Sequence, residues 1–208
     1  MLTKTYQWGD CSVLDGELGK WKINTFTVKS AKDDLYKFMA DFRAIRDGNA
    51  DMIVPAGTYR RLLRKDASGW TVVMSNTPME RNTNYQARQS ATGRVLINGL
   101  GMGMVLDGML NKSEVEYVRV IEKDAELIKL VGAHYAGNSR IEIVHADAFE
   151  YTPAKGERFG YVWHDIWDDI SEKNLPQMAT LNRKYSRFTK LQGTWSRERV
   201  RKMQRRSY

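Results

Sequence analysis

The alternation of apolar and polar residues changes character near residue 92. Beyond that point, short runs rich in Val and Ile alternate with stretches whose apolar residues recur at helical spacing. This pattern predicts strands at 95–98, 118–122, 140–149, 159–165 and 188–192, and helices at 125–135, 175–185 and from 194. Alternating strands and helices are typical of parallel βαβ units with right-handed crossovers. We therefore predict that 93–208 form a Rossmann-like α/β domain, an open parallel sheet with helices on both faces.

Residues 1–92 are predicted to form a small α+β N-terminal extension. Residues 20–28 alternate with period two, which indicates a strand. Residues 58–64 and 70–74, joined by the turn Asp66–Gly69, indicate a β-hairpin. A helix is expected between them, capped by Ser30 and ending near Arg46. Its apolar face would hold Leu35, Phe38, Met39 and Phe42.

A further helix is predicted just before the second domain. The residues Thr77-Pro78-Met79-Glu80 match a capping box with proline at the first helical position, and the helical pattern continues to Gln89. This segment could fold over a ligand as a lid, in which case Tyr85 would face the substrate. It could equally serve only to cover the sheet.

The first strand of the second domain leads into a glycine-rich turn. Residues 95–103 are Val-Leu-Ile-Asn-Gly-Leu-Gly-Met-Gly. A strand, a Gly-x-Gly-x-Gly turn and a helix together place backbone N–H groups beside a ligand, and the helix start adds partial positive charge. Glu122 ends the next apolar run, where a carboxylate can accept hydrogen bonds from both hydroxyls of a ribose. The pattern predicts a nucleoside-containing ligand; the alternative is a structural turn.

Acidic residues also follow the next two strands. The third strand ends in Asp147-Ala148, and the fourth ends in His164-Asp165 with Asp168 shortly after. The carboxyl ends of parallel strands line the crevice in which such sheets bind ligands. These side chains are therefore candidates for the same site as the glycine turn.

With these motifs, residues 94–169 resemble the class I S-adenosylmethionine-dependent methyltransferase superfamily. The resemblance implies that the turn containing Asn98, Gly99, Gly101 and Gly103 holds the methionine part of the cofactor. Glu122, with its neighbour Lys123, is implied to bind the ribose, and Asp147 with Ala148 to contact the adenine. Members of the family usually have two more strands than the five expected here. The sheet would then be trimmed at its C-terminal edge, with cover from the N-terminal region or from a second subunit of a homo-oligomer.

Within the superfamily, the chain resembles the spermidine-synthase branch, and it also resembles short phage and actinobacterial methyltransferase-like proteins. The likeness to spermidine synthases lies in the turn and in Asp165-Ile166-Trp167-Asp168 after the fourth strand. The turn has Met102 where aminopropyltransferases have an aspartate. This difference favours S-adenosylmethionine over its decarboxylated form as the cofactor.

The fourth strand end carries the candidate chemistry. His164 and Asp165 are candidate catalytic residues, since either could take a proton from an acceptor in an in-line methyl transfer. Trp167 is a candidate wall for the substrate, and Asp168 adds negative charge that would favour a cationic amine. The three acids Asp165, Asp168 and Asp169 could alternatively bind a divalent cation, or simply cap the next helix. We predict no metal.

Charge and cysteine content set further limits. The net charge is +8, but from Arg183 to Arg206 the chain has ten Lys or Arg and one acid, Glu198, so the excess belongs to the tail. A tail of this kind could bind nucleic acid through phosphates, or be a solvated surface. The chain has one cysteine, Cys11, and lacks an apolar run of membrane-spanning length, which favours a cytoplasmic protein without a membrane partner.

The sequence therefore favours an S-adenosylmethionine-dependent methyltransferase-like enzyme acting on a small acceptor, such as an amine. An aminopropyltransferase is the nearest enzymatic alternative. From a different class, the chain could be a non-catalytic nucleic-acid-binding or assembly protein that uses its basic tail.

Overall fold

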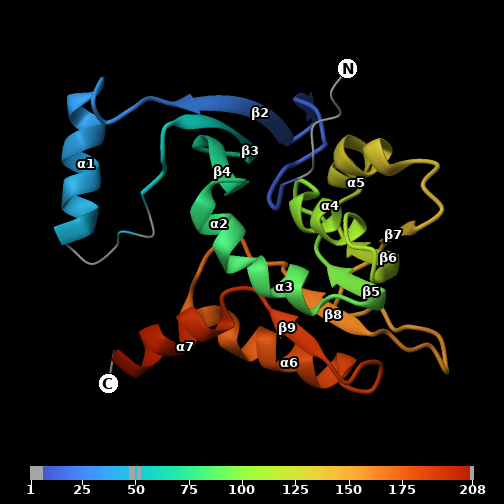
Figure 1. Ribbon diagram of the computed structural model, residues 1–208. Coiled ribbons are helices and arrows are strands. Elements are labelled where there is room, and N and C mark those ends of the chain that lie inside the picture. Colours follow the sequence, from blue (N-terminus) through green and yellow to red (C-terminus); the bar gives the residue numbers. More distant parts are fainter. Residues whose placement is uncertain (1–6, 47–49, 51–52, 207–208) are drawn as a thin grey trace.

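A computed structural model describes residues 7–46, 50 and 53–206, and these form two separate β-sheets (Figure 1). One is antiparallel, with the strand order β1-β2-β3-β4. The other has the order β7-β6-β5-β8-β9, and all of its neighbouring strands are parallel. This confirms the predicted α/β fold with an open parallel sheet. The N-terminal strands form their own sheet and do not extend the parallel one.

The parallel sheet consists of β5 (Gly93–Asn98), β6 (Val115–Glu122), β7 (Ile141–His145), β8 (Tyr161–His164) and β9 (Gln192–Thr194). Successive residues of a strand face opposite sides of a sheet. Val95 and Ile97 accordingly enter one hydrophobic core, while Leu96 enters another. A sheet with both faces buried explains why its strands are nearly continuous apolar runs.

Helices cover both faces. The core with Val95 and Ile97 also contains residues of α4 (Met104–Leu110), α5 (Ala125–Val131) and the 3₁₀ turn η2 (Gly132–Tyr135). The core with Leu96 contains residues of α6 (Leu175–Tyr185), which follows η3 (Glu172–Asn174). The last helix is α7 (Arg197–Arg206). None of the helices in the described part of the chain is long and apolar enough to span a membrane.

The last strand lies later than predicted. The residues at 188–191 turn instead of extending, because the Thr189 hydroxyl accepts a hydrogen bond from the Leu191 N–H. The backbone carbonyl of Phe188 accepts a hydrogen bond from the N–H of Phe159. The strand therefore begins at Gln192 and has three residues, a length typical of a protected sheet edge.

The antiparallel sheet consists of β1 (Gly16–Leu18), β2 (Trp21–Val28), β3 (Gly57–Asp66) and β4 (Gly69–Ser75). The predicted hairpin is confirmed as β3–β4. The predicted helix is present as α1 (Leu35–Arg46), but it starts after Ser30, and Asp34 accepts a hydrogen bond from the Lys37 N–H at its start. None of its residues is buried, and Figure 1 shows α1 at the margin of the molecule.

The segment between the two sheets contains two short helices, α2 (Pro78–Thr83) and α3 (Tyr85–Ser90), where one helix was predicted. Pro78 is in the first turn as expected, but the capping box does not form. The Thr77 hydroxyl contacts that of Ser75, and the Glu80 carboxylate accepts the N–H of Ser75. Glu80 is thereby buried at the junction between β4 and α2.

The N-terminal region is attached to the parallel domain through α4 and α5. Strands β1 and β2 pack against α5. Ser12 donates its backbone N–H and its hydroxyl to the buried carboxylate of Asp107 on α4. The thiol of Cys11 donates to the carbonyl of Met102 in the glycine turn. These contacts hold the antiparallel sheet over the carboxyl ends of the parallel strands.

Candidate functional site

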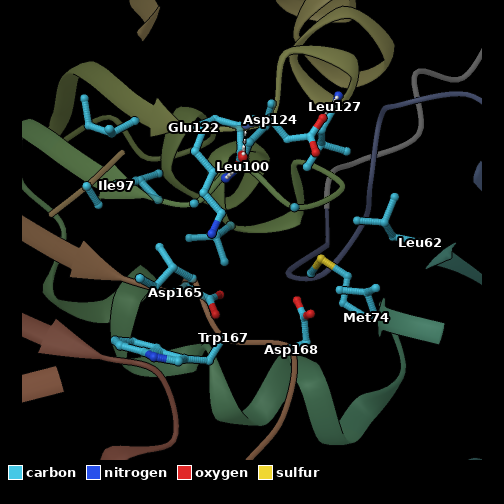
Figure 2. Close-up of a pocket in the computed structure, with 18 of the residues that line it drawn as sticks. Leu62, Met74, Ile97, Leu100, Glu122, Asp124, Leu127, Asp165, Trp167 and Asp168 are labelled. Carbon is cyan, nitrogen blue, oxygen red and sulfur yellow. Dashed lines mark hydrogen bonds between the residues drawn. The ribbon is translucent and has the colours of Figure 1, made fainter. Parts of the chain in front are cut away.

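A cavity of about 250 Å³ lies between the antiparallel sheet and the carboxyl ends of the parallel strands (Figure 2). The order of the parallel strands reverses at β5, and the crevice at such a switch point is where open α/β sheets bind ligands. The parallel domain contributes the glycine turn and the loops after β6, β7 and β8. The N-terminal region contributes Lys20, Trp21, Leu62, Arg64, Val73, Met74 and Glu80.

The glycine turn forms one wall of the cavity. Gly99 has φ of 100°, and a Cβ there would lie 1.9 Å from the backbone oxygen of Asp165. Gly101 has φ of 51°, and a Cβ there would lie 2.5 Å from the Met74 sulfur. Gly99 therefore needs glycine for conformation and for space, since the atom in the way belongs to the backbone. Gly101 needs glycine mainly for its positive φ, because the flexible Met74 side chain can move aside.

Glu122 lies at the end of β6, directly beside this turn. One carboxylate oxygen accepts the N–H of Leu100 at 3.0 Å, and the other accepts the N–H of Asp124 at 2.8 Å (Figure 2). The side chain is nearly buried but lines the cavity. The carboxylate is thus fixed in orientation by the backbone, and lone pairs remain for a ligand's hydroxyl groups.

The residues assigned to the adenine end also line the cavity. Asp147 and Ala148 follow β7, and the Asp147 carboxylate accepts the N–H of Phe149 at 2.7 Å. The backbone oxygen of Ala148 accepts the Tyr185 hydroxyl, which ties this loop to α6. Lys123 lies in the lining next to Glu122. Six of the eight predicted cofactor residues therefore line the cavity: Gly99, Gly101, Glu122, Lys123, Asp147 and Ala148.

His164 does not lie where a catalytic base is needed. Its ring is fully buried and outside the cavity lining, with Nδ1 2.7 Å from Asn98 Nδ2 and Nε2 3.1 Å from Gln192 Oε1. Burial lowers the pKa of His164 to about 4, so the ring is neutral at pH 7. These contacts fit a structural role, and they keep the ring outside the cavity in which the predicted base would have to act.

Three other predicted residues also lie outside the lining. Asn98 is fully buried, and its side chain contacts the His164 ring, which links the ends of β5 and β8. Gly103 forms the start of α4 and contacts the Tyr135 hydroxyl through its carbonyl. Tyr85, on α3, is exposed and does not face the cavity, which corrects the prediction of a substrate contact.

Asp165 lines the cavity together with a second acid that the sequence did not single out. Burial raises the pKa of Asp165 to about 8, and the negative charge of Glu80 adds to this increase. Burial also raises the pKa of Glu80 to about 7, although the N–H of Ser75 opposes the shift. Glu80 comes from α2, so the pair brings together two regions distant in sequence. Both carboxyls therefore titrate close to neutral pH, where each can take up or release a proton.

Trp167 and Asp168 lie near Asp165 in the same lining, as predicted (Figure 2). The indole N–H of Trp167 donates to Gln177 on α6 at 2.8 Å, which fixes the ring. Asp168 forms an ion pair with Arg64 of β3, with 2.6 Å between its oxygen and the guanidinium nitrogen. Within the described residues, no group of three or more His, Cys, Asp or Glu is arranged to hold a metal ion.

The basic tail is separate from this cavity. Helix α7 buries Val200 and exposes Arg201, Lys202 and Arg205. Trp195, just before the helix, is buried and donates its indole N–H to Thr83 of α2. The tail is thereby docked to the domain, while most of its charge faces solvent.

No protein-family model matches the chain, and no curated protein matches it in sequence. Among solved structures, it is similar to the 23S rRNA methyltransferase ErmE, with TM-score 0.36 and 26% identity over 41% of this chain and 35% of that one. It is also similar to the N-methyltransferase NodS from Bradyrhizobium japonicum WM9 in complex with S-adenosyl-L-homocysteine (TM-score 0.40, 18% identity, 53% and 56% covered). A third is spermidine synthase from Thermotoga maritima (TM-score 0.40, 17% identity, 62% and 60% covered). The chain spans less than two thirds of each of these proteins.

Proposed function

We propose that this chain is an S-adenosylmethionine-dependent transferase, and specifically a methyltransferase that acts on a small amine. One observation carries the proposal. The glycine turn, Glu122, Asp147 and Asp165 follow four different strands, and all of them line a single cavity. The residue types expected for the nucleoside, the methionine part and the proton transfer thus meet at the switch point of the sheet, where such folds bind ligands.

The lining fits the parts of this cofactor. The Glu122 carboxylate, held by two backbone N–H groups, suits the hydroxyls of a ribose. The loop with Asp147 and Ala148 would meet the adenine, and the turn from Gly99 to Gly101 the methionine part. Lys123 would lie beside the ribose.

When bound, the cofactor supplies an electrophilic methyl group on a positively charged sulfur. The protein then has to orient the acceptor in line with that group and remove a proton from it. Asp165 lines the cavity and titrates near pH 8, so it suits the proton-accepting role. Glu80 and Asp168 add negative charge nearby, which favours an acceptor that arrives as an ammonium ion. Trp167 would form an apolar side of the acceptor site.

Aminopropyl transfer is the alternative within the same fold. Its donor lacks the carboxylate and therefore carries an extra net positive charge. Glu80 supports this alternative, because it provides an acid near the glycine turn that Met102 does not. Incubation with each donor and an amine would distinguish the two, since the products differ in mass by the group transferred.

A second candidate function rests on the exposed basic side chains of α7. A helix of this kind suits contacts to nucleic-acid phosphates that weaken steeply with salt. If this were the main function, binding to RNA or DNA would persist in a variant that no longer binds the cofactor.

The direct test is a calorimetric titration with S-adenosylhomocysteine. We expect micromolar binding by the wild-type protein and at least tenfold weaker binding by Glu122→Gln, which keeps the size of the side chain but loses its charge. Glu116→Gln, an exposed change on the same strand, is the matched control and should bind normally. An absence of binding by the wild-type protein would contradict the proposal.

A further inference from the structure

The cavity has an uneven distribution of charge. At the end with Glu122, Lys20 forms an ion pair with Asp124, with 2.6 Å between nitrogen and oxygen, and Lys123 lies alongside. The other end contains Glu80, Asp165 and Asp168, and its cation is Arg64. A ligand group with negative charge at this second end would meet three acids, so it would need Arg64 as its partner.

Arg64 is held in position by the antiparallel sheet. It pairs with Trp21 of β2 in the strand register, and its guanidinium lies 5.8 Å from the centre of the Trp21 ring. Its contact with Asp168 uses one guanidinium nitrogen. A guanidinium has five N–H donors in a planar fork, so the group can hold a second carboxylate at the same time.

The position of Arg64 relative to the glycine turn follows from the hairpin register. Leu62 of β3 pairs with Met74 of β4, and the Met74 sulfur lies against Gly101 and accepts the N–H of Met102. Arg64 is two residues beyond Leu62 on the same strand, a distance of about 7 Å along it. Both Leu62 and Arg64 line the cavity, so Arg64 lies on the wall that faces the turn, one step along the strand from the side chains that reach it.

We propose that Arg64 binds the α-carboxylate of the donor's amino-acid end and thereby selects S-adenosylmethionine over its decarboxylated form. The inference rests on the proposed function and specifies its donor. The α-ammonium of the same ligand faces the acidic side chains of this end, Glu80 and Asp165. The second end of the cavity is then complementary to an amino-acid zwitterion, and the N-terminal sheet provides its cation.

Three ligands separate the contributions in a calorimetric titration. S-adenosylhomocysteine has both the ammonium and the carboxylate, its decarboxylated form has the ammonium alone, and 5′-methylthioadenosine has neither. All three share the nucleoside and the sulfur. Since hydrogen bonds to charged groups are among the stronger ones, the wild-type protein should bind S-adenosylhomocysteine at least about tenfold more tightly than the decarboxylated form.

The variant Arg64→Met should remove this difference. We expect it to weaken binding of S-adenosylhomocysteine about tenfold or more and to leave the other two ligands within about twofold of wild type. Arg64→Lys, which keeps the charge but not the planar fork, should fall in between. Arg61→Met is the matched control: Arg61 is on the same strand, but it contacts Asn24 and Phe26 and is absent from the lining. It should change none of the three affinities.

Three outcomes would overturn the inference. Equal wild-type affinity for the first two ligands would show that no carboxylate is recognised. An equal loss for all three ligands in Arg64→Met would show that Arg64 supports the cavity as a whole, for example through its ion pair with Asp168, and does not recognise the carboxylate. Absence of binding for all three ligands would overturn the proposed function itself, whereas retained binding of 5′-methylthioadenosine would preserve it.

Discussion

The two sheets form one cavity but contribute different chemistry to it. The parallel sheet supplies the glycine turn and the acids at its strand ends, Glu122, Asp147 and Asp165. The antiparallel sheet and the segment after it supply apolar side chains, the cations Lys20 and Arg64, and the buried acid Glu80. The central parallel strands β5 and β8 are buried on both faces, whereas the antiparallel sheet has many partly exposed residues.

The two regions would thus serve two different purposes, recognition of the nucleoside and discrimination between donors or acceptors. The features that would recognise a nucleoside come from local patterns in one domain, where a turn or a strand end determines what each residue does. The features that would distinguish one donor or acceptor from another come from residues that reach the cavity only when the two sheets dock. Changes in the two regions should therefore have different consequences.

The largest effect is expected from the parallel domain. Asp165→Asn should lower the rate of methyl transfer to an amine by about 100-fold or more, since a general base typically contributes ~10²–10⁴. In the wild-type protein, kcat/KM should rise with pH up to about 8, because the Asp165 carboxyl must lose its proton to act. The variant should lose this dependence, measured at saturating S-adenosylmethionine because Asp165 also faces the donor's α-ammonium. An unchanged pH profile in the variant would assign the base to another group.

The next effect concerns the contact between the turn and the loop after β8. Gly99→Ala should lower the free energy of unfolding by about 2–4 kcal/mol, because its Cβ would collide with the backbone of Asp165. Gly137→Ala is the control, since Gly137 also has positive φ but has open space around it, and should cost about 1 kcal/mol. Urea denaturation measures both. Equal losses would indicate that backbone strain alone explains the glycine.

A smaller effect on stability is expected at Glu80 on the N-terminal side, where the substitution should stabilise the protein instead of destabilising it. Burial raises the pKa of Glu80 to about 7, so the folded chain holds this proton more tightly than the unfolded chain. The resulting stabilisation is complete below about pH 4.5 and is lost as the pH rises through 7. Glu80→Gln should therefore match wild type at pH 4 and be more stable at pH 8, by up to about 3 kcal/mol. A flat difference across this range would contradict the burial of a titrating acid.

The smallest effect is expected where the two sheets meet at the surface. Lys20→Met removes the ion pair with Asp124, and the lysine side chain is half exposed, so the loss of stability should be under about 1 kcal/mol and should shrink in high salt. Lys22→Met, whose partner Glu17 lies within the antiparallel sheet, is the control. Thermal unfolding at low and high salt measures the difference. A larger loss for Lys22→Met would contradict a role of Lys20 in docking.

The sequence predicted the parallel domain well because each of its motifs is local. A few consecutive residues are enough to identify a strand that ends in a glycine turn or in an acid. His164 shows the limit of this reasoning, since it is adjacent to Asp165 but points away from the cavity. The side chains of adjacent residues in a strand alternate, and the pattern alone did not say which of the two faces the ligand.

The N-terminal contributions could not be predicted for a different reason. Arg64 was one of several polar residues in a hairpin. Glu80 matched a capping box, so the start of a helix already explained an acid at that position. Their places in the cavity depend on how two separate sheets pack. The apolar face of α1 illustrates the same limit, because a pattern typical of a buried helix belongs here to a helix with no buried residue.

The β3–β4 hairpin precedes in the chain the parallel strands against which it packs, and this has a consequence for the order in which the chain acquires its structure. During synthesis, the hairpin β3–β4 leaves the ribosome long before Asp168 and can pair with β2 at once, since its contacts are local. The surface formed by Leu62 and Met74 then has no partner until β5 and β8 are complete. Ribosome-bound chains that stop short of β8 should therefore present this apolar surface to chaperones, and a nucleoside ligand should protect only chains that extend beyond it.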